Sequence, residues 1–171
     1  MIDHIPELMA AGLDSLKIEG RAKSAYYAAI VTAAYRHAID AAAAGKPLDP
    51  VWREEVEKVS HRHYSTGFYF GQPGQYTADA RYIRDWQVVA VVTACDAAGN
   101  ATLSLRNKFS TGDELELVGP DVAATPFVAR EMTDADGFPL TQPRNPQMVF
   151  HMKLPRQVPP LSLIRACREN S

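Results

Sequence analysis

Charged side chains gather in one short segment near the start of the 171-residue chain. Lys17 and Glu19 lie on the polar side of a predicted strand, and Arg21 follows in the turn before the next helix. In β/α architectures this edge of a strand carries functional groups, and a helix N-terminus favours anions. We therefore interpret Lys17, Glu19 and Arg21 as candidate catalytic residues at a phosphate or carboxylate site. A structural network of ion pairs explains the same spacing equally well.

A second group of candidates lies in an aromatic, glycine-punctuated loop that begins at residue 61. His61 and His63 would share one face of an extended segment, as metal ligands can, but no third ligand is identifiable, so we expect no metal. The aromatic side chains of the loop, Tyr64 among them, could stack on bases, but filling the space between two domains is the favoured interpretation.

Basic residues in the middle of the chain support the hypothesis that the protein binds RNA. The 18 Lys and Arg residues are balanced by 20 Asp and Glu residues, which gives a formal net charge of −2. This balance argues against nucleic-acid binding by bulk charge and leaves room for a local patch. The positions that could contact phosphates are Arg62, Arg81, Arg84, Arg106 and Lys108.

The cysteines and the N-terminal residues indicate a cytoplasmic protein. Cys95 and Cys167 are too few for a disulfide framework and lack the paired spacing of a zinc or iron–sulfur site. The first residues lack the basic and apolar regions of a signal peptide. Because no stretch reaches the roughly 18 apolar residues of a membrane span, we expect no membrane partner.

The first 45 residues are predicted to fold as helix, strand and helix. Residues 5–12 have a proline in the first turn and a terminal glycine, as a short helix would, and 13–19 alternate as a strand does. Ser24 can cap a second helix that ends at Gly45. This order is typical of one β/α unit, but a complete eight-stranded barrel needs roughly 200 residues or more.

The remainder of the chain is predicted to be a linker and an antiparallel barrel. Asp49 caps a third helix that runs to about Val59, and the aromatic loop continues to about Arg84. Short strands with frequent turns then indicate a small antiparallel β-barrel, which makes the fold class α+β. We predict strands over 86–95, 101–107, 114–118, 127–132, 147–154 and 162–166, and three parts over 1–45, 46–84 and 85–171.

Three groups of motifs together resemble the collagenase-like peptidase family U32. They are Ile5–Leu8 with Ala11–Ser24, Ala34–Arg36 and Ala38–Asp40, then Ser60–Gly71, then Arg106–Phe109 with Gly112–Glu116. The resemblance runs essentially from end to end. One departure is Ala22, where the family usually has methionine.

The resemblance implies an architecture and a set of binding residues. Family members have an N-terminal β/α barrel, so 1–45 would be its last unit, with Lys17, Glu19 and Arg21 facing its mouth. The later motifs supply substrate-binding candidates: His61, Arg62, Tyr64, Arg106 and Lys108. The family's early cysteine-bearing signature is absent, so we expect no cofactor in this chain and an iron–sulfur cluster only in a full-length protein.

The activity that the resemblance implies is divided between peptidases and proteins that support hydroxylation of tRNA, ribosomal RNA or a quinone precursor. We expect a C-terminal accessory portion, a lid or a substrate-presenting part, that is catalytically incomplete alone. The alternative is an RNA-binding β-barrel module, and a third hypothesis is a small metal-dependent hydrolase that uses His61 and His63. Expected partners are the missing N-terminal barrel domain, a peptide or RNA substrate, and a second copy that pairs through residues 1–45.

Overall fold

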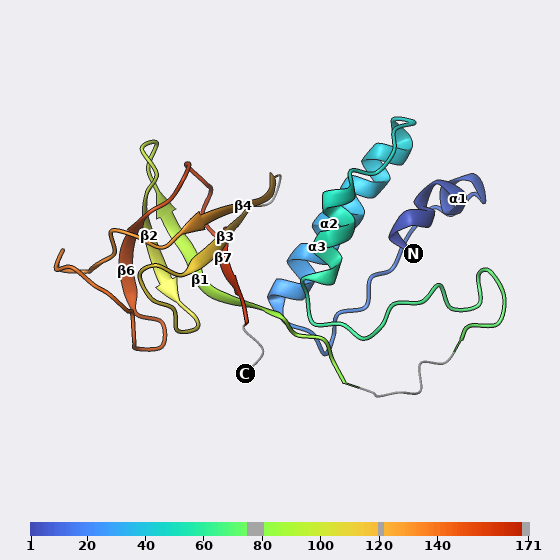
Figure 1. Ribbon diagram of the computed structural model, residues 1–171. Helices are drawn as coiled ribbons and strands as arrows, with labels where there is room; N and C mark the ends of the chain where they lie inside the picture. The colour runs from blue at the N-terminus through green and yellow to red at the C-terminus, as the bar shows by residue number, and fades with distance from the viewer. Residues whose placement is uncertain (75–80, 120–121, 169–171) are drawn as a thin grey trace. The chain divides into compact units, whose positions relative to one another are not determined.

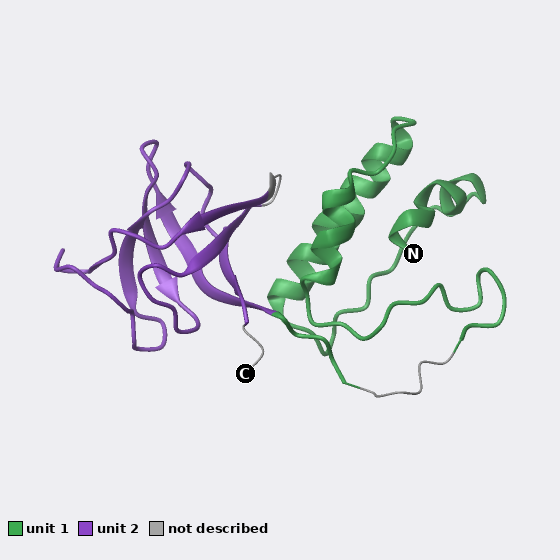
Figure 2. Ribbon diagram, viewed as in Figure 1, with its two compact units in different colours: residues 1–85 green, residues 86–171 purple. Residues whose placement is uncertain are grey.

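The protein consists of two compact units in a computed structural model that describes residues 1–74, 81–119 and 122–168. Unit 1 is Met1–Asp85 and unit 2 is Trp86–Ser171, as Figure 2 shows by colour. Unit 1 is helical and unit 2 is built from strands (Figure 1). This composition confirms the α+β fold class.

The described residues of unit 1 form three α-helices whose ends follow local sequence signals. A 3₁₀ turn, Ile2–His4, leads into α1, Ile5–Ala10, which is followed by α2, Ala25–Ala43, and α3, Pro50–Glu57. The Ser24 hydroxyl accepts a hydrogen bond from the Tyr27 backbone N–H at 3.2 Å, and an Asp49 carboxylate oxygen accepts one from Val51 N–H at 3.0 Å. Both predicted N-caps are therefore confirmed, because each side chain satisfies an otherwise unpaired N–H.

The three helices share one small apolar core. Spacings of three and four residues place Ala34 and Ala38 on one face of α2, where they pack with Ile5 of α1 and Val56 of α3. Ile2 completes the buried set, and Trp52 and Leu16 pack against it. This core holds α2 and α3 together.

The strand predicted over residues 13–19 does not form. Residues 13–20 have no regular secondary structure, and Leu13 and Ile18 are 48% and 37% exposed. A strand needs a neighbour for its backbone N–H and C=O groups, and within the described part of unit 1 no strand pairs with this segment. Of the predicted helix-strand-helix order, the two helices form as α1 and α2, and the strand between them is absent.

The described residues of unit 2 form a single antiparallel sheet of seven strands in the order β4-β3-β7-β1-β2-β6-β5. Its inner face encloses one core that includes Val89, Leu103, Phe150 and Ile164, each fully buried. The strands are β1 Trp86–Cys95, β2 Asn100–Leu105, β3 Glu114–Gly119, β4 Val122–Val128, β5 Thr133–Asp134, β6 Val149–Lys153 and β7 Leu163–Cys167.

The sheet is open, which corrects the predicted barrel. β4 and β5 are its two edges, and they do not pair with each other in the described residues. The predicted strand over 127–132 is interrupted, because β4 ends at Val128 and Glu131 has a φ of 54°. β5 is only two residues long, so it offers little backbone for closure.

Aspartates form the two predicted turns. Asp96 accepts hydrogen bonds from the backbone and side-chain nitrogens of Asn100, both at 2.8 Å, and these bonds lower the pKa of its carboxyl. Asp134 accepts from the backbone N–H groups of Asp136 and Phe138 at 3.0 and 2.9 Å. The segment at Asp134 is therefore a hairpin turn, as its sequence predicts.

We predict that Gly99→Ala destabilises unit 2 far more than Gly137→Ala. Both glycines have positive φ, 85° and 87°, but a Cβ at Gly99 would lie 2.7 Å from the Leu154 carbonyl oxygen, whereas one at Gly137 meets nothing within 4 Å. The φ penalty alone is about 1 kcal/mol, and the clash should raise the loss at Gly99 to about 3 kcal/mol. Urea unfolding measures both losses, and equal values would contradict this packing.

Candidate nucleic-acid interface

A two-residue bridge joins the ends of the long loop of unit 1. The His61 N–H donates to the Ile83 carbonyl at 3.2 Å, and the Ile83 N–H donates to the His61 carbonyl at 2.8 Å. In antiparallel pairing this register sets Arg62 opposite Tyr82. Because alternate residues point to opposite faces, Arg62, Tyr82 and Arg84 share the face away from His61.

His61 anchors this bridge to α3. Its side chain is buried, with Nδ1 at 2.8 Å from the Val59 carbonyl oxygen and Nε2 at 3.0 Å from a Glu57 carboxylate oxygen. Its ring stacks on Tyr64, with the centroids 4.6 Å apart. Both ring nitrogens are engaged, so in this structure the imidazole positions the segment and has no free nitrogen for a ligand.

Three cations surround the ring of Tyr82. Lys23 Nζ lies 4.2 Å from the ring centroid, and the guanidinium carbons of Arg62 and Arg84 lie 4.8 and 5.3 Å from it. Lys23 is held in place because its Nζ donates to the Ser60 carbonyl at 2.8 Å. We call Lys23, Arg62, Tyr82 and Arg84 the Tyr82 cluster.

The charge of the Tyr82 cluster is not neutralised by a carboxylate of the residues that the structure describes. Among the described residues, no carboxylate lies within ion-pairing distance of Lys23, Arg62 or Arg84. Cations over an aromatic face are stabilised by the ring, but their mutual repulsion favours binding of an external anion. Guanidinium and ammonium groups beside a partly exposed tyrosine can bind phosphate oxygens and stack on a base.

Lys17, Glu19 and Arg21 form a chain of surface ion pairs. Glu19 carboxylate oxygens lie 3.8 Å from Lys17 Nζ and 3.9 Å from Arg21 Nε, and one also accepts from the Arg21 backbone N–H at 3.0 Å. The side chains are 84%, 59% and 89% exposed. This geometry matches the ion-pair interpretation of their spacing.

The remaining sequence candidates are divided between the two units. Tyr64 donates its hydroxyl to the Val56 carbonyl at 2.7 Å, and burial, with the Glu57 carboxylate adding to it, raises the pKa of its phenol. Arg106, in unit 2, donates from Nη1 to the Ser104 hydroxyl at 2.8 Å, and Lys108 is exposed. Only Arg62 of the predicted substrate-binding set belongs to the Tyr82 cluster.

Sequence reasoning missed Lys23 and Tyr82 as binding residues. Lys23 follows the charged segment, but its place beside Tyr82 depends on a contact 59 positions along the chain. The run Arg81-Tyr82-Ile83-Arg84 has a basic residue at each end and a tyrosine between them, which is a signal that could have found the ring.

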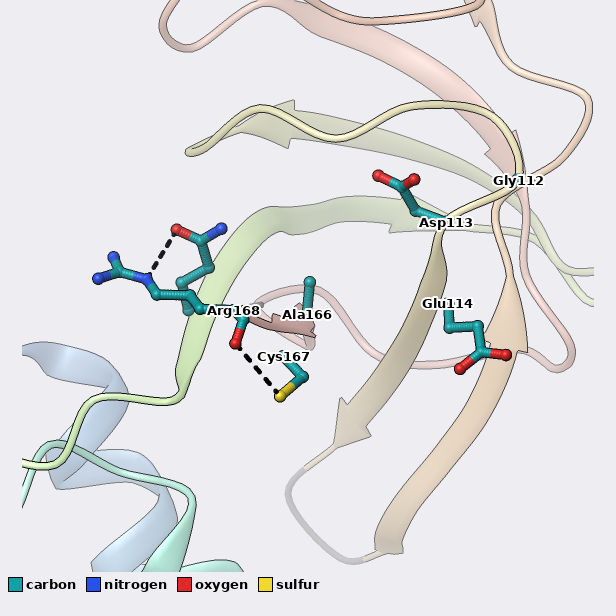
Figure 3. Close-up of a pocket in the computed structure, with 7 residues that line it drawn as sticks. Gly112, Asp113, Glu114, Ala166, Cys167 and Arg168 are labelled. Atoms are coloured by element: carbon teal, nitrogen blue, oxygen red, sulfur yellow. Dashed lines mark hydrogen bonds between the residues drawn. The ribbon is translucent and has the colours of Figure 1, made fainter. Parts of the chain in front are cut away.

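The polar side chains that line a larger hollow in unit 2 do not converge on one point. It measures about 780 Å³ and is lined by Gln87 of β1, Asp113 and Glu114 at the start of β3, and Arg168 after β7. Arg168 Nε donates to the Gln87 side-chain oxygen at 3.2 Å, and the two carboxylates point in different directions (Figure 3). The hollow therefore presents no common point to a ligand.

The cysteines do not form a site for an iron–sulfur cluster. Cys167 pairs with Trp86 at the start of β1, whereas Cys95 ends that strand, so the two lie about 30 Å apart at a strand rise of about 3.3 Å per residue. In the part of the chain that the structure describes, no group of three or more His, Cys, Asp or Glu side chains could hold a metal. Among the described helices, none has the length and apolar character needed to cross a bilayer.

The sequence profiles of two consecutive domains of one family match this chain. Peptidase family U32 matches residues 1–79, and the peptidase family U32 C-terminal domain matches residues 84–165. The chain belongs to peptidase family U32. Since it holds the family's C-terminal domain, this chain is a C-terminal portion of the U32 architecture, as its motifs predict.

Several similar proteins are named for tRNA hydroxylation. The chain is 34% identical to tRNA hydroxylation protein P1 of Bacillus subtilis over 96% of its own length, and 39% identical to tRNA hydroxylation protein P of Escherichia coli over 80%. An uncharacterized protease of Methanocaldococcus jannaschii is 36% identical over 77%. The chain spans 41%, 31% and 34% of these relatives' lengths.

Solved structures of a family domain are also similar to this chain. The C-terminal domain of a U32 peptidase from Geobacillus thermoleovorans is 31% identical, with a TM-score of 0.44. The match covers 46% of this chain and 98% of that domain.

We predict that Lys23→Met loosens the loop bridge more than Arg62→Met. Lys23 loses a charged hydrogen bond to Ser60 and its ring contact, which should cost about 1–2 kcal/mol in the free energy of opening. Arg62 loses only its contact with a partly exposed ring, about 0.5 kcal/mol. Hydrogen exchange of the Ile83 amide reports both effects, and a larger effect for Arg62→Met would contradict the assigned anchor.

Proposed function

We propose that this portion of a U32 protein binds RNA and presents it in tRNA hydroxylation. The Tyr82 cluster supports this function most directly, because its three cations have no carboxylate partner in the described residues and share one partly exposed ring. The Bacillus and Escherichia relatives, named for tRNA hydroxylation, point to the same class of substrate. The cluster contacts the phosphate backbone, and sequence is read elsewhere.

A local cluster fits the overall charge of the chain. With a net charge of −2, the chain as a whole does not attract a polyanion. Three cations around one ring, which have no carboxylate partner in the described part of the chain, supply a short-range attraction that acts within about 10 Å at ordinary ionic strength. The binding is therefore moderate in strength and steeply dependent on salt.

The chemical step belongs to parts of the relatives that this chain does not match. Lys17, Glu19 and Arg21 form ion pairs with one another at the surface, so none of them is positioned as a general acid or base. We expect the chain alone to bind tRNA without hydroxylating it. A hydroxylation assay that compares this chain with a full-length relative checks this, and equal activity would contradict the accessory role.

Peptide presentation is a second candidate, because one relative is named as a protease. Peptides carry few regularly spaced negative charges, so their binding would depend little on salt. Binding of denatured collagen to the chain, measured beside tRNA at several salt concentrations, separates the two candidates.

We predict that neutralising the Tyr82 cluster lowers the salt dependence of tRNA binding. The triple variant Lys23→Gln, Arg62→Gln, Arg84→Gln removes up to three phosphate contacts. The slope of log K against log salt concentration should then fall in magnitude by about 2, at about 0.7–0.9 per contact. Filter binding at several salt concentrations measures this slope.

The matched control removes the same charge from unit 2. Arg106→Gln, Lys108→Gln, Arg130→Gln changes the net charge equally at three exposed positions. This control should leave most of the slope intact. A slope that falls in the control and stays unchanged in the cluster variant would place the RNA surface in unit 2 and contradict the proposal.

A further inference from the structure

A second hollow in unit 2 lies on the outer face of the sheet, where β5 begins. In the described residues, β5 pairs only with Phe150 and His151 of β6. The last two residues of β6, Met152 and Lys153, therefore have no described strand beside them on that side. The opening that this leaves measures about 300 Å³. We call it the β5 hollow.

A row of three polar residues crosses the sheet beneath the β5 hollow. Thr102 of β2 and Thr133 of β5 both lie opposite His151 of β6, and residues paired in this way share a face. Phe150 and Met152, on either side of His151, are buried in the core, so the row lies on the outer face. His151 Nδ1 is 3.2 Å from the Thr102 hydroxyl oxygen. Among the described residues, His151 Nε2 and the Thr133 hydroxyl have no hydrogen-bond partner.

A carboxylate borders the β5 hollow without a cation beside it. Glu131 lines the hollow, and no cation of the described residues lies within ion-pairing distance of its carboxylate. Its φ of 54° is a left-handed conformation that costs free energy in a residue with a Cβ. The next residue, Met132, is 3% exposed, and its carbonyl accepts from the Leu140 N–H at 2.9 Å, so the core holds Glu131 in this conformation. Residues held under such strain cluster at ligand sites.

An ammonium group borders the same end of the β5 hollow. Lys153 is the last residue of β6, and antiparallel pairing places the end of β6 beside the start of β5. Lys153 Nζ donates to the Ala98 carbonyl and, at 3.3 Å, to the Asn100 side-chain oxygen, both of which are neutral. In the described part of the chain, no carboxylate oxygen lies within ion-pairing distance of this Nζ. Glu131 and Lys153 thus line one hollow without pairing with each other.

Opposite charges that do not pair favour a ligand that carries both charges. A ligand with a single charge would satisfy either Glu131 or Lys153 and leave the other alone, whereas a zwitterion complements both. The hydroxyl and imidazole groups of the row supply hydrogen bonds to either end of such a ligand. A volume of about 300 Å³ is at the lower end for ligand pockets, so it suits one amino acid better than a peptide.

We propose that the β5 hollow binds a free α-amino acid with an uncharged side chain. The ammonium group of the ligand pairs with the Glu131 carboxylate and donates to the Thr133 hydroxyl. The carboxylate of the ligand pairs with Lys153 and accepts from His151 Nε2. Since every one of these residues belongs to unit 2, the inference is independent of the Tyr82 cluster and of the proposed function.

The test compares three ligands that differ in charge. The full chain is titrated with L-alanine, N-acetyl-L-alanine and L-alaninamide, and the amide NMR shifts of Thr133 and His151 report binding. At neutral pH L-alanine carries both charges, N-acetyl-L-alanine only the carboxylate and L-alaninamide only the ammonium group. L-Alanine should bind at least about tenfold more tightly than either derivative, because each derivative lacks one charge-assisted contact.

Variants assign each charge of the ligand to its partner. Glu131→Gln should weaken L-alanine binding about tenfold and leave N-acetyl-L-alanine unaffected, since that ligand has no ammonium group to lose. Lys153→Met should weaken L-alanine and leave L-alaninamide unaffected. The matched control, Glu114→Gln, removes a carboxylate at an exposed position outside the hollow and should change nothing. The ligand comparison on the unmodified chain holds even where Lys153→Met disturbs the turn at Ala98.

The possible outcomes decide the proposal. Equal binding of the three ligands, or an absence of shifts at Thr133 and His151, overturns it. Binding of N-acetyl-L-alanine as tight as that of L-alanine also overturns it, because the hollow would then recognise a carboxylate alone, such as the end of a peptide. A loss in Glu114→Gln equal to that in Glu131→Gln would place the ligand elsewhere. None of these results bears on RNA binding by the Tyr82 cluster.

Discussion

The backbone bridge between His61 and Ile83 is the constraint on which the candidate interface depends. Two hydrogen bonds, of 3.2 and 2.8 Å, fix the register of segments that are distant in sequence. That register brings Arg62 and Arg84 to the ring of Tyr82, and Lys23 reaches the same ring by bonding to Ser60. His61 is buried and tied to α3, so the bridge rests on the helical core.

The cations of the Tyr82 cluster differ from other basic side chains because, among the described residues, no carboxylate pairs with them. Several basic side chains elsewhere meet a carboxylate and are accounted for by structure alone. These pairs are Arg36 with Asp40, Arg53 with Asp3, Lys58 with Glu55, and Arg165 with Glu116. The cations of the Tyr82 cluster instead meet an aromatic ring, which holds them in place but leaves their charge available to a polyanion.

Features that depend on neighbouring residues could be predicted from the sequence, and features that depend on distant partners could not. Ser24 and Asp49 cap helices as expected, and Asp96 forms its turn, because each side chain bonds to backbone within four positions. The strand predicted over 13–19 does not form because it has no pairing neighbour in the described part of unit 1. The strand predicted over 127–132 ends at Val128, before the positive φ of Glu131. Arg62 and Arg84 were expected to contact phosphates, but Lys23 and Tyr82 were missed because their contacts depend on the His61–Ile83 bridge and on the bond from Lys23 to Ser60.

Photo-cross-linking of tRNA to this chain, followed by mass spectrometry of the linked peptides, tests the central claim most directly. The account places the RNA backbone at the Tyr82 cluster. It therefore predicts cross-links in peptides that contain residues 23–27, 60–64 or 81–84. Cross-links found only in residues 86–168, with none in unit 1, would contradict it.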